Sequence, residues 1–441
     1  MGKYFRSNVV YTNIAKWWLV GFLIFLPFQR KIIKSIVSYS SELSKFISYL
    51  DELTIIIFLP LSLIKLYKLR EFPDRLCLIL LFSILVLCVS GFMSGVVNGN
   101  SLLVTTLGTF DYVKNFLVVF VYAAFFRDFR EFKGIFKLLL ILTVLLGVIA
   151  FIQELLALAV RYIIENDISD SLRNDNWRFG FYRTPSLMHH PNMFGLYSLL
   201  ILTIYLFMSK KINYAIFIPI SVGIFASISR MVYTGLIFVT VIQILRGKIR
   251  FIVLAVILTA ILAFYMPALK DITFIDTNNE FSGKISFREY ARDNAIDIWV
   301  NNPFWGVGPG IFGGVVSVKY NSFIYEEYNF SSDAVSFIRN VKSIDQFWPQ
   351  ILAETGIAGT AAFLGIFMAL FLTLFTLRQQ ATFSEVKGLF AGLMVFTIVI
   401  LIYTMGSGLN ITSIIFTYSA LVGMGVGSCR NSKYRSYIRN R

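Results

Sequence analysis

Charged residues and cysteines are scarce in this sequence, and each shortage excludes a class of protein. Only 15% of the 441 residues are charged while 57% are hydrophobic, a balance that water-soluble globular folds do not have. The three cysteines are Cys77 and Cys88, which share one apolar run, and Cys429 near the basic C-terminus. Because no pair is placed for a disulfide framework, an oxidised secreted domain is excluded.

Motifs for metal or nucleotide binding are also missing. Histidine occurs only at His189 and His190, and no HExxH or Walker pattern is present. Adjacent side chains diverge on a helix and no third ligand type lies near them, so we expect neither a metal site nor a cofactor. A formal net charge of +15 would suggest nucleic acid for a soluble protein, but here the basic residues lie mostly between apolar segments. Nucleic acid is therefore not an expected partner.

Long unbroken apolar runs make up most of the chain. Spanning a bilayer takes about 20 apolar residues per helix, and over such runs only helices satisfy their own backbone hydrogen bonds in lipid. The runs predict an all-α integral membrane protein with about 12 transmembrane helices. We expect these spans near residues 13–28, 46–64, 76–97, 102–126, 136–160, 185–208, 212–228, 231–245, 251–267, 348–377, 388–404 and 408–427.

The distribution of lysine and arginine predicts the orientation of these spans. Cytoplasmic connections of membrane proteins carry an excess of these two residues. Both tails and the connections on one side of the expected bundle are basic, whereas the other side is poorer in Lys and Arg. The first outer loop is an exception, since it contains Arg30, Lys31, Lys34 and Lys45. The overall bias predicts that both termini are cytoplasmic.

One outer connection is too long to be a turn in a compact bundle, and it divides the chain. Residues 268–347 form this loop, which we expect to be a partly helical domain on the periplasmic side. Transmembrane helices 1–9 precede it in residues 1–267, and helices 10–12 follow in residues 348–427. Residues 428–441 are the expected basic cytoplasmic tail.

Within the loop, the pattern of residues 286–300 predicts an amphipathic helix. Tyr290, Ile296 and Trp299 recur among charges at roughly helical spacing, which is typical of a helix lying on a membrane or a bundle. Residues 303–310 contain two prolines and three glycines, and this composition predicts a tight turn at the end of the helix.

Few charged residues fall inside the expected spans. Asp51 and Glu52 lie in the second span, and Asp111 and Lys114 lie three residues apart in the fourth. Such groups cost a few kcal/mol or more at the bilayer centre, so they face a partner or a cavity. We expect ion pairs between helices.

More informative motifs lie at four places on the outer side. Arg183 opens RTPSLMHHPN, Arg230 closes SISR, and Arg288 lies in the amphipathic helix. The fourth motif, DQFWPQILAETGIAG, leads into the tenth span. A single Arg at a helix end is commonly only an interfacial anchor. Several guanidinium groups on one side instead favour an anionic ligand, since they pair bidentately with phosphate oxygens.

In this order and on this scaffold, the four motifs resemble those of the O-antigen ligase and O-antigen polymerase superfamily, over most of residues 46–427. The resemblance implies a C-type glycosyltransferase fold in the bacterial cytoplasmic (inner) membrane, with its active site facing the periplasm. It also implies transfer of a glycan from undecaprenyl diphosphate to a hydroxyl group without a metal. The implied partners are the lipid-linked donor and acceptor glycans and the membrane lipids, and a chain-length regulator is left open.

The resemblance also implies roles for particular residues. Arg183, Arg230 and Arg288 are the candidates for binding the diphosphate, on which negative charge accumulates as the glycosidic bond breaks. Asp345 is the first candidate for accepting the proton of the acceptor hydroxyl, and Glu354 is the second. An alternative role for Glu354 is a structural bond to a neighbouring loop. Further candidates for substrate binding are His190, Asn192 and Gln346.

Ligases of this superfamily carry the motif H-(N/S/Q)-x9-G-x-x-G. Here Asp345 replaces the histidine, while Gln346, Gly356 and Gly359 match the rest. This departure favours a polymerase of repeat units over a ligase that transfers the glycan to lipid A core or to a protein. A flippase for the same lipid-linked sugars is a third alternative, but the large one-sided loop argues against a transporter.

Overall fold

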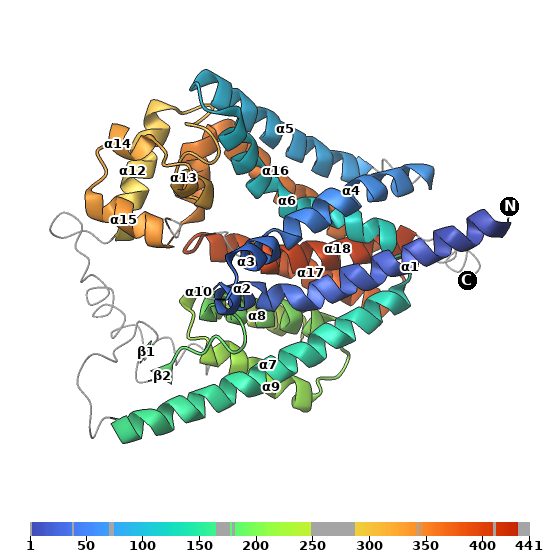
Figure 1. Cartoon of the computed structure of the whole chain (residues 1–441). Helices are drawn as coiled ribbons and strands as arrows, with labels where there is room; N and C mark the ends of the chain where they lie inside the picture. Colours follow the sequence, from blue (N-terminus) through green and yellow to red (C-terminus); the bar gives the residue numbers. More distant parts are fainter. Residues whose placement is uncertain are drawn as a thin grey trace.

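The computed structural model describes residues 2–37, 39–69, 75–164, 177–178, 181–247, 287–341, 344, 346–408 and 412–430. Within these residues the protein is helical apart from one two-stranded hairpin (Figure 1). The elements are α1 (Gly2–Phe25), η1 (Leu26–Phe28), α2 (Gln29–Ile36), α3 (Ser41–Ser48), α4 (Leu50–Lys68), α5 (Arg75–Val97), α6 (Leu102–Phe125), α7 (Phe129–Ile164), β1 (Trp177–Arg178), β2 (Phe181–Tyr182), α8 (Pro191–Met208), α9 (Tyr214–Ala226), α10 (Arg230–Leu245), α12 (Phe287–Asn301), α13 (Val315–Lys319), α14 (Ile324–Glu327), α15 (Ser332–Val341), α16 (Phe347–Gln380), α17 (Ser384–Thr404) and α18 (Thr412–Arg430).

Seven helices in the described part of the chain are long and apolar enough to cross a membrane: α5, α6, α7, α8, α16, α17 and α18. The helices α3 and α4, bent by 42°, make an eighth span if they are counted as one, and α9 and α10 are shorter apolar helices. This architecture is consistent with an integral multi-pass membrane protein. Seven of the twelve expected spans coincide with such helices, and the expected span at 251–267 lies outside the described residues.

The core of the bundle depends on close contact between helices. The most extensive packing joins α6 with α18, α5 with α16 and α8 with α17. At the contact of α6 with α18, a Cβ on Gly427 would lie 2.3 Å from the carbonyl oxygen of Phe126, and one on Gly423 would lie 2.4 Å from that of Val119. Small residues let helix backbones approach closely, and this gains van der Waals energy where lipid supplies no hydrophobic drive.

The helix α8 begins at Pro191, six residues later than the expected start at 185. Residues 183–190 instead form an extended and turn segment. Proline is favoured in the first turn because it has no N–H to satisfy, and the His190 ring Nδ1 accepts a hydrogen bond from the Asn192 N–H at 3.1 Å. The helix therefore begins at Pro191, where the first backbone N–H groups either are absent or have an acceptor.

The helices α12 to α15 surround a second hydrophobic core, separate from that of the bundle. The expected helix at 286–300 is confirmed by α12. Ile296 is 41% exposed, whereas the buried positions are Phe287, Ala291, Ala295 and Ile298. Alanines at i and i+4 let α12 pack closely.

A glycine-rich turn joins this second core to the bundle. Residues 306–310 lie against α6, where a Cβ on Gly108 would be 2.3 Å from the carbonyl carbon of Pro309. Gly306, Gly308 and Gly310 all have positive φ, which side chains with a Cβ rarely adopt. The tight turn expected from the sequence is present, and it presses its backbone directly onto a spanning helix.

The start of α1 and the second core mark the two ends of the bundle. The Lys16 ammonium of α1 lies 6.0 Å from the centre of the Phe126 ring, beside the last turns of α18. In Figure 1 the N-terminal end of α1 lies at the right and helices α12 to α15 lie at the left. The start of α1 and the end of α18 thus lie at the end of the bundle opposite the second core.

This arrangement predicts that α14 and the start of α17 lie on opposite sides of the membrane. In a chain whose native cysteines are replaced by serine, Glu327→Cys should react with an impermeant maleimide on intact spheroplasts. Lys387→Cys, also exposed, should react only after lysis. Equal labelling of both variants on intact cells would contradict this topology.

The contact of Gly108 with the turn predicts a loss of stability on adding one methyl group. Gly108→Ala forces backbone against backbone and should cost about 1–3 kcal/mol, as overpacking does. Gly134→Ala is the matched control, because a Cβ there has no neighbour within 4 Å, and alanine favours a helix by up to about 1 kcal/mol over glycine. Thermal unfolding in detergent would contradict the contact if both variants matched the parent.

Candidate functional site

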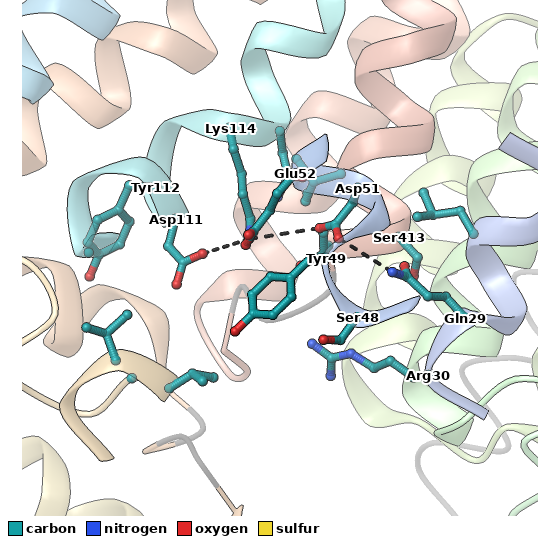
Figure 2. Close-up of a pocket in the computed structure, with 18 of the residues that line it drawn as sticks. Gln29, Arg30, Ser48, Tyr49, Asp51, Glu52, Asp111, Tyr112, Lys114 and Ser413 are labelled. Atoms are coloured by element: carbon teal, nitrogen blue, oxygen red, sulfur yellow. Dashed lines mark hydrogen bonds and ion pairs between the residues drawn. The ribbon is translucent and has the colours of Figure 1, made fainter. Parts of the chain in front are cut away.

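A cavity of about 520 Å³ lies between the bundle and the second core. It is lined by η1, α2, α4, α6, the turn at 310–316 and the first turns of α16 and α18. Figure 2 shows several of its polar side chains, which come from helices far apart in sequence. Its charged lining residues are Arg30, Asp51, Glu52, Asp111, Lys114 and Glu354.

Lys114 joins α4 to α6 through three carboxylates. Its ammonium lies 2.7 Å from Asp111, 2.9 Å from Glu52 and 3.9 Å from Asp51. Only 10% of the Lys114 side chain is exposed, so water screens these pairs weakly. The expected ion pairing between helices is confirmed, and it lies in the wall of the cavity.

Glu354 is the most completely buried charged residue of the site, with 1% of its surface exposed. Its Oε1 accepts a hydrogen bond from the Phe312 N–H at 2.8 Å, and its Oε2 accepts one from the Tyr112 hydroxyl at 2.5 Å. The structural bond to a neighbouring loop, one of the two roles considered for Glu354, is therefore present. Both carboxylate oxygens already serve as acceptors.

A break in α16 creates the place where the loop attaches. Gly356 has φ of 61° inside the helix, so the backbone there leaves the helical path. The carbonyls of Ala353 and Glu354 instead accept hydrogen bonds from the N–H groups of Val307 and Gly308, at 2.9 and 2.8 Å. Carbonyls freed by a helix break need such partners when they are buried.

Arg183 lies in a second polar cluster, at the start of α8. Its side chain is buried, and its Nη2 donates a hydrogen bond to Oδ1 of Asn192 at 2.8 Å. The next residue, Thr184, donates its N–H to the carbonyl of Ala226 at 3.0 Å, four residues before half-buried Arg230. The two predicted arginine motifs are thus brought together by backbone contact.

The basic first loop lies against this same cluster, which sequence reasoning missed. The Lys31 ammonium of α2 donates to the carbonyl of Ser186 at 3.3 Å. Burial, together with the nearby cations Lys34 and Arg30, lowers the pKa of His189, so this imidazole is neutral at neutral pH. The available signal was the exception to the charge bias, because the predicted orientation assigns these three cations to an outer loop.

The remaining predicted residues lie in different places. Arg288 is exposed on α12, one of the helices that surround the second core. Gln346 is half-buried and precedes the first turn of α16. His190 is exposed and caps α8. Asp345 lies outside the described residues.

A family model described as O-antigen ligase matches residues 215–364 of the chain. The match confirms the resemblance to the O-antigen ligase and polymerase superfamily. Members of this superfamily are membrane enzymes of the glycosyltransferase type. The matched segment contains Arg230, Arg288, Asp345 and Glu354, and it ends inside α16. A comparison with curated proteins finds no match.

The bonds of Glu354 predict how its variants behave. Glu354→Ala leaves two buried donors without an acceptor and should cost about 1–3 kcal/mol for each. Glu354→Gln keeps an oxygen for the Phe312 N–H, and its amide can donate to the Tyr112 oxygen, so it should stay close to the parent. Thermal unfolding of both variants in detergent tests this. Equal stability of Glu354→Ala and the parent would contradict the structural role.

Proposed function

We propose that the protein is a polymerase that joins undecaprenyl-diphosphate-linked oligosaccharide repeat units into O-antigen or a related surface polysaccharide, by metal-independent glycosyl transfer. The observation that carries the proposal is the superfamily match over residues 215–364 together with Asp345 at the position where ligases have histidine. The cavity beside the matched α16 supports it, because it offers polar groups at the edge of an apolar bundle.

In this mechanism the arginines stabilise the leaving diphosphate. Negative charge develops on it as the glycosidic bond breaks, and preorganised cations lower the energy of that transition state. Arg183 suits this role because Asn192 and burial hold its guanidinium in place. Arg230 is near it in the fold, and Arg288 would contribute from the second core. His190, Asn192 and Gln346 would help to hold the glycan.

The acceptor hydroxyl must lose a proton as the new bond forms. Asp345 is our candidate for accepting it. Phe347 and Gln350, which follow it closely in the sequence, line the cavity. Glu354 is better suited to positioning, since its oxygens already accept bonds from Phe312 and Tyr112. It would hold the first turns of α16 against the segment around Phe312, next to the cavity.

We place the enzyme in the bacterial inner membrane, with twelve spans, both termini in the cytoplasm and the loop domain of residues 268–347 in the periplasm. The position of the second core opposite the start of α1 and the end of α18 supports this orientation. The donor is then reached from the membrane and the acceptor from the periplasm.

A ligase that transfers the finished glycan to lipid A core or a protein is the alternative function, and the description of the matching family favours it. The two functions differ in acceptor and share the donor chemistry. They are distinguished by the glycans that accumulate when the protein is absent.

Deletion of the gene should leave a single repeat unit on the surface lipid if the protein is a polymerase. Complementation with Asp345→Asn should fail to restore long chains, because the amide cannot accept the proton. Asp293→Asn is the matched control, since Asp293 is exposed on α12 and pairs only with its neighbour Arg292 among the described residues. Electrophoresis of the surface glycan, at equal protein in the membrane, measures both.

Two outcomes would contradict this proposal. Long undecaprenyl-linked chains that never reach the surface lipid would identify a ligase. Restoration of parental chain lengths by Asp345→Asn would show that another group accepts the proton.

A further inference from the structure

We propose that Arg30 of α2 is a further binding residue, whose guanidinium holds the diphosphate end of the lipid-linked glycan in the cavity. This inference rests on the proposed function, because it assumes a glycosyl diphosphate as the substrate. It concerns a residue outside the segment that the family model matches. Three observations carry it: the guanidinium has no partner among the described residues, the backbone that carries it is held in place, and the cavity is polarised.

Arg30 is the available cation of the cavity. Lys114, the other cation in the lining, is engaged by three carboxylates. Arg30 is exposed, lines the same cavity, and makes no hydrogen bond or ion pair with the residues that the structure describes. Arg30 and Ser48 both line the cavity, and Figure 2 shows Arg30 on the opposite side of Tyr49 from Asp111 and Tyr112. A planar group with five donors suits phosphate oxygens.

The nearest competing anion is already engaged. Asp51 attracts Arg30 electrostatically, but its Oδ1 lies 3.5 Å from the Gln29 amide nitrogen and its Oδ2 lies 3.9 Å from the Lys114 ammonium. The side chain of Asp51 is only 8% exposed. Asp51 therefore belongs to the wall of the cavity and leaves the donors of Arg30 to a ligand.

The backbone next to Arg30 is firmly held. Gln29 is buried, and its Nε2 donates to the carbonyl of Ile47 at 2.8 Å, which ties α2 to α3. On the far side of α2, Lys31 bonds to Ser186. The start of α2 is thus fixed between two neighbours before any ligand arrives, and such preorganisation reduces the entropy lost on binding.

The cavity has a cationic end and a hydroxyl-binding end. The cationic end is α2, which contributes Arg30. At the other end, half-exposed Asp111 and the Gln350 amide offer the hydrogen-bond partners that sugar hydroxyls use. Carboxylates repel phosphate but accept bonds from hydroxyls. This polarity favours a molecule with an anionic head and a hydroxyl-rich body, and it orients a glycosyl diphosphate with its phosphates at α2.

Binding by the purified full-length protein in detergent tests the proposal. The Kd for an undecaprenyl-diphosphate-linked repeat unit would be measured directly, with inorganic pyrophosphate as the competitor. Arg30→Gln should raise this Kd about ten- to a hundredfold, as loss of a hydrogen bond to a charged group does, and pyrophosphate should compete correspondingly less. Arg30→Lys should be intermediate, because it keeps the charge but loses the fork.

The matched control is Lys45→Gln. It removes one positive charge from neighbouring α3, where Lys45 pairs with Glu42 on the surface, and it should change the Kd less than about twofold, as surface pairs contribute little. Folding can be checked by thermal unfolding. Replacing Arg30 leaves no hydrogen-bond partner unsatisfied, so the variants should unfold like the parent.

Unchanged donor binding by Arg30→Gln would overturn the proposal. If donor binding is unchanged but the Arg30→Gln variant retains less phosphatidylglycerol in mixed phosphatidylglycerol and phosphatidylcholine vesicles, Arg30 holds a phospholipid headgroup instead. The binding assay needs no turnover. A ligase phenotype in the deletion strain would therefore refute the proposed function while Arg30-dependent binding of pyrophosphate still stood.

Discussion

The attachment of the glycine-rich turn to the broken helix α16 is the interaction on which the site depends. A buried carboxylate is tolerated only when its oxygens have partners, and Glu354 finds them in the Phe312 N–H and the Tyr112 hydroxyl. The same break at Gly356 frees backbone carbonyls for Val307 and Gly308. One short stretch of chain therefore fixes the second core to two spanning helices and forms one wall of the cavity.

Electrostatics then divides the cavity into parts with different chemistry. Lys114 binds together the carboxylates of α4 and α6, so most of the charge in the spans is internally compensated. Arg30 and half-exposed Asp111 remain accessible on two sides of Tyr49 (Figure 2). A low-dielectric wall strengthens any interaction made with these groups. The arrangement combines a rigid, neutralised frame with a few charges that a substrate can reach.

The sequence predicted the helical membrane architecture because the period and length of apolar runs are local properties. The ion pairs of Lys114 were also predictable, since a charge in a span requires a partner. The buried face of α12 was not, because Ala291 and Ala295 carry no strong apolar signal and their burial depends on the neighbours. The start of α8 was misjudged for a related reason. The span was expected to begin at residue 185, but contacts such as that of Thr184 with Ala226 hold residues 183–190 outside the helix.

The cations of α2 show how an exception to a statistical rule can be informative. Lysine and arginine are disfavoured in short outer loops, yet α2, which the sequence assigns to such a loop, carries three of them in eight residues. Composition alone treats them as evidence against the orientation. In the fold, Lys31 bonds to the carbonyl of Ser186, and Arg30 faces the cavity without a partner among the residues that the structure describes. Lys31 and Arg30 therefore have positions in the fold that do not depend on how the chain inserts into the membrane. The Lys/Arg bias and its exception are therefore compatible. The bias reflects how a chain inserts into the membrane, whereas the cations of α2 are explained by their neighbours in the folded protein.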